Sequence, residues 1–344
     1  MSKQRVALTS PLAAGRTILK VILFLANVFP FPLKPLDWIV GRPSHRHWRT
    51  SSLAGSLVHD AWTPVWPYRG ARPALVIAMG VRTAPHDRPV LRRFATTLAR
   101  LGFVVVWPRL TALDRARPGA EHPDTFVTTV ETLRQSRGVN PARISLVGFS
   151  VGGSTALVAA ADQQIAADVR AVVFFGGFFD ALDYLAAAAA ATSEFERRRV
   201  AWRPSLGAYE HLLQVLSSLR VGGLLRAFPS RSLDEARATL AAAPPSERAA
   251  LEALSPAEVI GAVRARLFIL HDRQDRMVHY FESLKLLRAL GPRPNAEVTL
   301  VDLFEHVQPR AGLTGSGLRE LWRLARFLFR TLGYLDGSIR SGRR

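Results

Sequence analysis

Cysteine is absent from this chain of 344 residues, so disulfide bonds, thiolate metal sites and cysteine nucleophiles are excluded. Lysine is nearly absent as well, because it occurs only at Lys3, Lys20, Lys34 and Lys285. Arginine therefore supplies almost all of the positive charge, and Lys+Arg 46 against Asp+Glu 27 give a formal net charge of +19. A charge of this size attracts anionic lipids, nucleic acids or acidic substrates at long range, but does not identify which of them binds.

Nucleotide and nucleic-acid binding patterns are also missing. No GxGxxG or GxxxxGK string opens a helix, and the arginines are scattered instead of gathering in one basic tract with interleaved aromatic residues. We therefore expect no nucleic-acid partner, no organic cofactor and no metal. With 48% hydrophobic and 21% charged residues, the composition is that of a folded globular protein. At this length we expect one core that carries an inserted subdomain.

A long uninterrupted apolar run is lacking too. The apolar stretch at residues 18–33 is stopped by Pro30 and Pro32, whereas a membrane-spanning helix needs about 20 apolar residues, so full spanning is the weaker interpretation. A cleaved secretory signal is disfavoured because no small-x-small cleavage site follows Leu25. Two interpretations remain equally favoured: an interfacial helix in peripheral contact with an anionic membrane, and a helix packed on the protein itself. We expect a cytoplasmic protein in either case.

Short β-branched runs alternate with helical stretches in the rest of the chain, which is the pattern of an α/β fold. The runs are apolar throughout, as strands buried on both faces of a sheet would be. Strands are predicted at residues 74–79, 103–107, 144–147, 171–175, 267–270 and 298–301. Helices are predicted after most of them, the last one carrying a leucine stripe from Leu318 to Leu332.

The other segments complete the predicted organisation. Residues 38–66 are expected to form a connection rich in proline and tryptophan, and Asn140-Pro141 a turn. Between residues 178 and 263 the strand rhythm stops and Ala, Leu and Arg dominate, which predicts inserted helices. The predicted parts are an N-terminal segment 1–50, a first core part 51–177, the helical insertion 178–263, a second core part 264–336 and a frayed basic tail 337–344.

The segment Gly148-Phe149-Ser150-Val151-Gly152 directly follows a predicted strand and opens a predicted helix. A serine hydroxyl is a weak nucleophile, so it needs a base to take its proton and donors to hold the oxyanion that it creates. Glycines on both sides of a serine allow the sharp strand-to-helix turn that exposes such a nucleophile. We predict Ser150 as the nucleophile and the backbone N–H of Val151 as an oxyanion donor. A tight turn without chemistry is the less favoured alternative.

Two later loops contain candidates for the acid and the base. Asp272 and Asp275 follow the strand at residues 267–270, and one of them should orient the base. His306 follows the last predicted strand, from where a histidine can reach back to the serine. The chain order Ser, Asp, His is the one expected for hydrolases whose nucleophile lies on a turn between a strand and a helix. Seven of the nine histidines lie in connections, helices or early strands, where an ordinary role is the default: His45, His47, His59, His86, His122, His211 and His279.

These motifs together resemble the α/β-hydrolase superfamily, especially its dienelactone-hydrolase-like and prolyl-oligopeptidase-like branches of serine esterases and peptidases. Residues 140–153 resemble the nucleophile elbow, which implies Ser150 as the nucleophile. The loop from His271 resembles the pattern His-Gly-x-x-Asp-x-x-Val and implies Asp275 as the acid. Phe304-Glu305-His306 resembles the closing Phe-x-His segment and implies His306 as the base. Asp272 replaces the family's glycine and stays as an alternative acid.

The resemblance implies an α/β-hydrolase fold: a mostly parallel central sheet flanked by helices, with a helical lid inserted before the strand that carries the acid. It also places the second oxyanion donor on the loop Met79-Gly80-Val81, where the N–H of Val81 is favoured. This loop departs from the family's pattern because Met79 replaces the histidine of its His-Gly pair.

The activity expected from these residues is that of a serine hydrolase. It would cleave a carboxylic ester or thioester through a covalent acyl-enzyme, with a small acyl ester or a lipid-like substrate under the lid. A serine peptidase or acyltransferase on the same fold is the nearest alternative, and a non-catalytic, membrane-associated scaffold is the alternative from another class. Fold alone would justify none of these activities. The oligomeric state does not follow from the sequence.

Overall fold

A central sheet of eight strands organises the computed structural model, which describes residues 6–8, 10–29, 34–52, 55–64, 70–80, 88–110, 122–292, 295–309 and 317–341. The strands are β2 (Ser44–Ser52), β3 (Gly55–Thr63), β4 (Arg72–Ala78), β5 (Val104–Pro108), β6 (Val139–Phe149), β7 (Val169–Phe175), β10 (Arg266–Asp272) and β11 (Ala296–Val301). Their order is β11-β10-β7-β6-β4-β5-β3-β2. All pairs from β11 to β5 are parallel, whereas β3 and β2 run antiparallel to their neighbours. The predicted mostly parallel sheet is confirmed.

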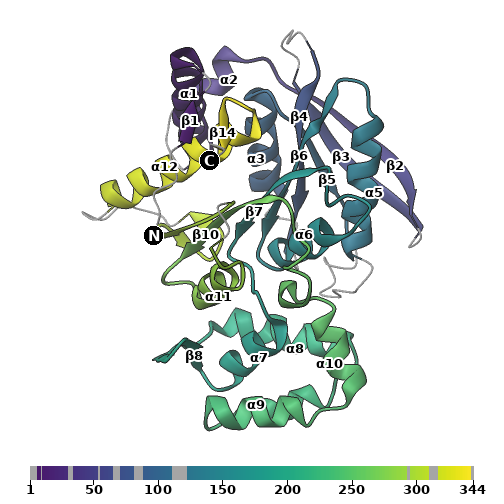
Figure 1. The fold of residues 1–344 in the computed structure, drawn as a ribbon, viewed down its shortest axis with the longest axis vertical. Helices are drawn as coiled ribbons and strands as arrows, with labels where there is room; N and C mark the ends of the chain where they lie inside the picture. The colour runs from purple at the N-terminus through teal and green to yellow at the C-terminus, as the bar shows by residue number, and fades with distance from the viewer. Residues whose placement is uncertain are drawn as a thin grey trace.

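Helices cover both faces of this sheet (Figure 1). One face packs on α1 (Pro11–Val28), α3 (Arg88–Arg100) and α12 (Gly317–Leu335), and the other on α5 (His122–Gln135), α6 (Val151–Ala161) and α11 (Phe281–Ala289). Within β4, Ala74 and Val76 belong to one core cluster, while Leu75 and Ile77 belong to the other. Successive side chains of a strand point to opposite faces, so a strand covered on both sides is apolar throughout.

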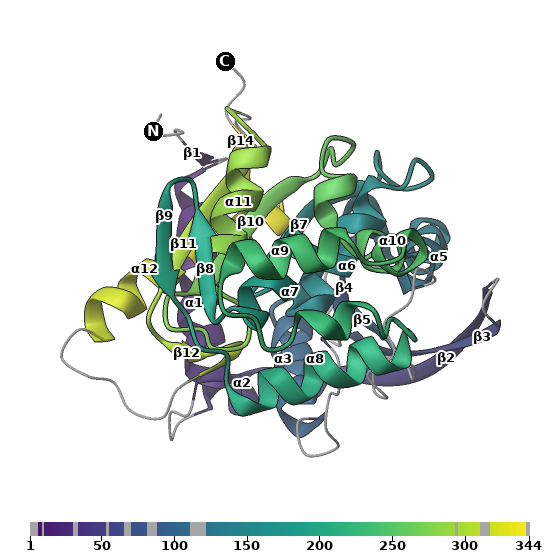
Figure 2. The same ribbon diagram turned by 90° about the horizontal axis from the view of Figure 1, so that it is seen from below.

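Residues 178–263 form a separate layer at one end of the sheet (Figures 1 and 2). Its elements are α7 (Ala181–Ala189), β8 (Thr192–Phe195), β9 (Arg198–Ala201), α8 (Leu206–Ser218), η2 (Leu224–Ala227), α9 (Leu233–Ala241), α10 (Pro245–Glu252) and η3 (Pro256–Glu258). This layer has a hydrophobic core largely of its own, which includes the buried residues Leu185, Leu216 and Leu224. The layer is helical apart from the β8–β9 hairpin, which the sequence analysis did not predict.

The helix α1 begins at Pro11, earlier than the apolar run itself, after the side chain of Ser10 caps its N-terminus. Thr17, Val21, Phe24 and Asn27 are its buried residues, and Val21 and Phe24 join the core cluster of α3 and α12. This face of α1 therefore packs on the protein itself. Of the helices in the described ranges, α1 alone is long and apolar enough, by length and composition, to cross a membrane.

The predicted connection at residues 38–66 was wrong, because the segment contains the end of a helix and two strands of the sheet. Besides the short helix α2 (Pro35–Ile39), the segment holds β2 and β3, so the predicted boundary at residue 50 falls inside β2. β2 is the edge strand and is half-buried or exposed from Ser44 to Thr50, whereas its inner neighbour β3 buries the polar side chains of His59 and Asp60. Their mixed composition therefore masks the strand pattern.

Two further predictions were wrong at chain turns and ends. Asn140-Pro141 lies inside β6, where the strand bulges: Val139 pairs with Arg72 and Ile144 with Ala74, so the residues between them are looped out. The tail is not frayed throughout, since β14 (Ile339–Ser341) pairs antiparallel with β1 (Val6–Leu8). Ile339 is buried, and burial of this one apolar residue favours an ordered tail.

Candidate active site

Ser150 forms the turn between the end of β6 and the start of α6. Its backbone has φ 53° and ψ −133°, in the positive-φ region that non-glycine residues rarely adopt. Strain of this kind persists only where the surrounding structure imposes it, and it concentrates at functional sites. The N–H of Val151, in the first turn of α6, has no carbonyl available within the helix, and its role as an oxyanion donor stays a prediction.

The glycines on both sides of Ser150 are required by close packing. A methyl group added to Gly152 would lie 2.2 Å from the carbonyl oxygen of Ala78, and one on Gly148 would lie 2.5 Å from Cα of Gly153. The turn therefore excludes any side chain at these two positions.

The loop that follows β4 lies directly beside the serine. A methyl group on Gly80 would come within 2.9 Å of Cβ and 3.3 Å of Oγ of Ser150. The predicted second oxyanion donor, Val81, lies outside the described residues, so its role stays a prediction. The position of Gly80 shows that this loop reaches Ser150.

Asp275 and His306 are in contact: Nδ1 of the imidazole lies 2.7 Å from Oδ2 of the carboxylate. The other carboxylate oxygen accepts hydrogen bonds from the N–H groups of Met277 at 2.7 Å and Val278 at 3.0 Å. Burial alone would raise the pKa of Asp275, but the charge of His306 and hydrogen bonds from His271 and His306 outweigh it and hold the pKa well below its usual range. The carboxylate is therefore ionised beside the imidazole.

The alternative acid, Asp272, binds the backbone of the segment before His306. Its Oδ2 accepts hydrogen bonds from the backbone N–H groups of Leu303 at 2.7 Å and Phe304 at 2.8 Å. It thereby holds the chain that leads to His306, and is a structural residue of the same site.

His306 and Ser150 lie beside the same glycine turn at the end of β7. A methyl group on Gly176 would lie 3.5 Å from Cε1 and Nδ1 of His306, and one on Gly177 would lie 2.8 Å from the carbonyl oxygen of Ser150. Nε2 of His306 is buried and has no hydrogen-bond partner among the described residues, so it is not bonded to Ser150 Oγ. Catalytic hydrogen bonds are often long without substrate and tighten when it binds. The arrangement can pass a proton from a serine hydroxyl to an imidazole that a carboxylate orients.

Residues of the inserted layer form hydrogen bonds to the loop that carries Asp275. The sequence did not predict these contacts. Trp202 Nε1 donates to the carbonyl oxygen of Asp275 at 2.9 Å, and the hydroxyl of Tyr184 donates to that of Met277 at 2.8 Å. The N–H of Ser205 donates to the carbonyl oxygen of Arg276 at 2.8 Å. Three consecutive carbonyls are thus bound by residues distant in sequence. No local sequence motif predicts such contacts.

A buried ionic cluster joins the insertion to the core. The carboxylate of Glu282 accepts hydrogen bonds from the N–H groups of Phe179 and Asp180, where the insertion begins. Burial raises the pKa of Glu282, although Lys285, at 2.6 Å, opposes this. Lys285 also binds Asp183 on α7. The cluster fixes the insertion on α11.

Among the described residues, one group of side chains could hold a metal ion. His45, His47 and Asp60 each offer a ligand atom, and these atoms lie within 4.8 Å of one another. Asp60 is buried and also bonded to Arg109, so its charge is already compensated. The group lies apart from Ser150 on β2 and β3, and we assign it no part in the site.

Comparisons of sequence found no matching family model and no matching curated protein. Comparisons of structure found an acylaminoacyl peptidase from Pyrococcus horikoshii at TM-score 0.53 and 15% identity, covering 85% of this chain and 41% of that one. A dipeptidyl peptidase 4 from Porphyromonas gingivalis aligns at TM-score 0.53 and 16% identity, covering 84% and 36%. The 2,6-dihydroxy-pseudo-oxynicotine hydrolase aligns at TM-score 0.51 and 16% identity, covering 83% and 68%.

This chain therefore spans less than half the length of the two peptidases, at 41% and 36% of their chains. At these identities the likeness concerns the fold. The order of the sheet, the helices on both faces and the solved structures that align with it agree on one conclusion: this chain has the α/β-hydrolase fold.

Proposed function

We propose that this protein is a serine hydrolase with Ser150 as nucleophile, His306 as base and Asp275 as the acid that orients it. One observation carries the proposal: the 2.7 Å contact between His306 and Asp275 lies at the glycine turn that also contacts the strained backbone of Ser150. Ionised Asp275 favours the tautomer in which Nδ1 of His306 carries the proton, which leaves Nε2 as the acceptor for the serine proton.

The proposed reaction is acyl transfer through a covalent intermediate. Ser150 Oγ attacks the substrate carbonyl while His306 takes its proton, and the N–H of Val151 stabilises the oxyanion. His306 then returns the proton to the leaving group. Water attacks the acyl-enzyme with the same imidazole as base and releases Ser150. The chain's own residues supply each of these roles.

The first substrate class that we propose is a carboxylic ester or thioester. The insertion offers an apolar surface next to the nucleophile, since Val151 packs on its core cluster together with Leu182 and Tyr184. Such a wall suits an apolar acyl chain. The second candidate is a peptide substrate, which the likeness to acylaminoacyl peptidase and dipeptidyl peptidase 4 favours.

The test is to compare hydrolysis of p-nitrophenyl esters of increasing acyl length with hydrolysis of peptide p-nitroanilides. Ser150→Ala should lower kcat by about four orders of magnitude or more, because nothing replaces the nucleophile. A fluorophosphonate label should attach to Ser150 and be absent from the variant. Ser136→Ala, at the end of α5, is the matched control and should retain full activity and labelling.

Faster turnover of the anilides than of the esters would contradict the ester proposal and support a peptide substrate. Neither turnover nor label in a protein that unfolds cooperatively would contradict the hydrolase proposal and favour the scaffold alternative.

We also propose that the outward face of α1 contacts an anionic membrane surface. Leu12, Ile18, Leu19 and Ile22 of this helix are 77%, 51%, 55% and 57% exposed, an unusual apolar face for a water-exposed helix. A second copy of the chain is a poorer occupant, because two molecules of net charge +19 repel each other, whereas an anionic bilayer attracts them. The substrate classes above do not depend on this contact.

Vesicle sedimentation tests the contact. Ile18→Gln with Ile22→Gln should abolish binding of the intact chain to vesicles that contain phosphatidylserine, since both side chains would lose their place in the lipid boundary. Leu206→Gln with Leu213→Gln, two exposed leucines of α8, is the matched control and should bind like the wild type. Equal binding by all three proteins would rule the α1 face out.

A further inference from the structure

Two histidines and one aspartate meet on the strands β2 and β3, which β5 and β4 separate from the strand that leads to Ser150. His45 and His47 are two positions apart on β2, and alternate side chains of a strand point to the same face of a sheet. His47 pairs directly with Asp60 on β3. Directly paired residues also share a face. The pairing of β2 with β3 therefore brings the three side chains together.

Two ring nitrogens converge on one oxygen of the Asp60 carboxylate. Nε2 of His45 lies 2.9 Å from Oδ1, and Nδ1 of His47 lies 2.7 Å from the same atom. These three atoms all lie within 4.8 Å of one another. The two imidazole rings also meet edge to face, with their centroids 4.7 Å apart. The three ligand atoms are therefore close enough to share one ion.

The chemistry of these atoms suits a divalent transition metal. Imidazole nitrogen and carboxylate oxygen are common ligands of zinc and of similar ions. Such ligands lie about 2.0–2.2 Å from zinc, so two of them in a tetrahedral site are about 3.4 Å apart. The two contacts at Oδ1 are shorter than this. Binding therefore requires each ring to move outwards by roughly half an ångström, with the ion replacing the protons in these contacts.

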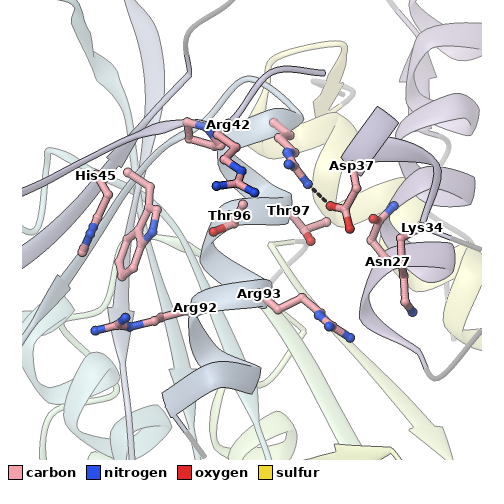
Figure 3. A pocket seen from close by; sticks show the side chains of 12 residues that line it. Asn27, Lys34, Asp37, Arg42, His45, Arg92, Arg93, Thr96 and Thr97 are labelled. Atoms are coloured by element: carbon pink, nitrogen blue, oxygen red, sulfur yellow. Dashed lines mark hydrogen bonds and ion pairs between the residues drawn. The ribbon is translucent and has the colours of Figure 1, made fainter. Parts of the chain in front are cut away.

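Both rings have room for this movement. The side chain of His47 is 56% exposed, and that of His45 is 31% exposed. Figure 3 shows His45 at the edge of a cavity of about 310 Å³, whose lining also includes Trp62. The exposed side gives an ion a path from solvent and leaves room for a water ligand at an open position.

The carboxylate of Asp60 is held in place through its other oxygen. Oδ2 accepts a hydrogen bond from Nε of Arg109, and the side chain of Asp60 is only 2% exposed. Hydrogen bonds of this kind orient a carboxylate toward a metal. Arg109 also weakens the attraction of Asp60 for a cation. The ion would nevertheless keep its contact with water, so its charge would not be buried without compensation.

We propose that His45, His47 and Asp60 form a binding site for one divalent transition metal ion, with zinc as the probe. A bound ion links the edge strand β2 to β3 and thereby stabilises this side of the sheet. The site is separate from the hydrolase chemistry, since its ligands include none of the proposed catalytic residues. It departs from the expectation of no metal because the three residues meet only when β2 and β3 are paired.

The experiment uses the full chain without an affinity tag and measures Zn²⁺ binding by calorimetry. Elemental analysis after dialysis counts the bound zinc, and thermal unfolding with and without Zn²⁺ is a third readout. His47→Gln and, separately, His45→Gln each remove one ligand. His211→Gln, on α8, removes a histidine outside the group and is the matched control. Mg²⁺ is the second probe, because it prefers oxygen ligands.

We expect the wild type and the control to bind one Zn²⁺ per chain, and both ligand variants to bind it at least about tenfold more weakly. Zn²⁺ should raise the Tm of the wild type and of the control more than that of the ligand variants.

Equal zinc affinity in all four proteins would mean that histidines elsewhere bind the ion, and would overturn the proposal. Absence of zinc binding by a folded wild-type chain would overturn it as well, and so would Mg²⁺ binding as tight as that of Zn²⁺. Urea unfolding without metal verifies that each variant is folded. None of these readouts uses ester turnover, so the test is independent of that of the hydrolase.

Discussion

Ser150 and His306, the proposed nucleophile and base, both adopt positive φ, 53° and 57°, although neither is glycine. Residues other than glycine are strained in this backbone conformation. Tight packing around Gly148, Gly152 and the Gly176-Gly177 turn maintains it. Asp275 is held differently, by two backbone N–H groups on one oxygen and an imidazole on the other. Packing by neighbouring glycines thus fixes the backbone of Ser150 and His306, and hydrogen bonds from the backbone help to orient Asp275.

Two buried histidines make the stability of the fold depend on pH. His59 lies on β3 and His279 follows the loop of Asp275. Burial lowers the pKa of His59 to about 4 and that of His279 to about 3. In the unfolded chain both titrate near about 6.5, so below that pH the unfolded state binds more protons and stability falls as the pH drops, until the folded pKa is reached. Each histidine contributes about 1.4 kcal/mol per pH unit to this loss.

Replacing His279 by phenylalanine keeps an aromatic ring against Trp202 and Phe281 but removes the proton site. Urea unfolding between about pH 6 and about pH 5 should then show a slope smaller by about 1.4 kcal/mol per pH unit than that of the wild type. A slope unchanged from the wild type would contradict the assignment of this histidine.

At the scale of elements, the site is assembled by strand ends. Ser150 follows β6, Asp275 follows β10 and His306 follows β11, and parallel neighbouring strands bring their carboxyl ends to one edge of the sheet. The insertion adds a second support, because Trp202 and Tyr184 bind carbonyls of the loop after β10. The core supplies the three proposed catalytic residues, and the insertion restrains the loop of one of them, Asp275.

Trp202 is therefore predicted to act as a positioning residue for Asp275. Trp202→Phe keeps the ring and removes the hydrogen bond from Nε1 to the carbonyl oxygen of Asp275. We expect kcat to fall by about tenfold with KM little changed, because a displaced acid loop misorients His306 without altering the substrate wall. Trp48→Phe is the control. Nε1 of Trp48 is buried and has no hydrogen-bond partner in the part of the chain that the structure describes, so its removal should leave kcat unchanged. A parallel rise in KM would indicate a general disturbance of the insertion.

At the scale of the whole molecule, the N-terminal helix is part of the folded unit. Phe24 is buried and its ring contacts that of Phe94 on α3 at 5.8 Å, while Lys20 binds Asp336 near the other end of the chain at 2.6 Å. The same helix also turns an apolar face to solvent, so its packing on the core and the proposed membrane contact use different faces.

Phe24→Ala measures how much α1 contributes to stability. Removal of a buried phenylalanine ring should lower the free energy of unfolding by about 3–5 kcal/mol, whereas Leu19→Ala on the exposed face should change it by less than about 0.5 kcal/mol. Chemical denaturation followed by tryptophan fluorescence compares both with the wild type. Equal, small effects would mean that α1 is detached from the core in solution.

The sequence by itself determined the central strands, the nucleophile turn and the order of the three candidate residues. Strands buried on both faces must be apolar along their whole length, and the elbow at Ser150 tolerates only glycine at Gly148 and Gly152, so both features appear as local patterns. Such patterns can be recognised without neighbours in space. The same holds for His306, whose place after the last strand is a matter of chain order.

Only the tertiary structure decided what depends on contacts between distant segments. It brought Asp275 to His306 and directed Asp272 to the backbone of Leu303 and Phe304, a choice that two nearby carboxylates in one loop do not reveal. It placed β2 at the edge of the sheet and β3 beside it, where exposed residues on β2 and buried polar residues on β3 obscure the strand pattern. It also joined Trp202 to the loop of Asp275 across 73 positions of the chain. Long-range packing sets these contacts, because each one forms only when the whole sheet and insertion are in place.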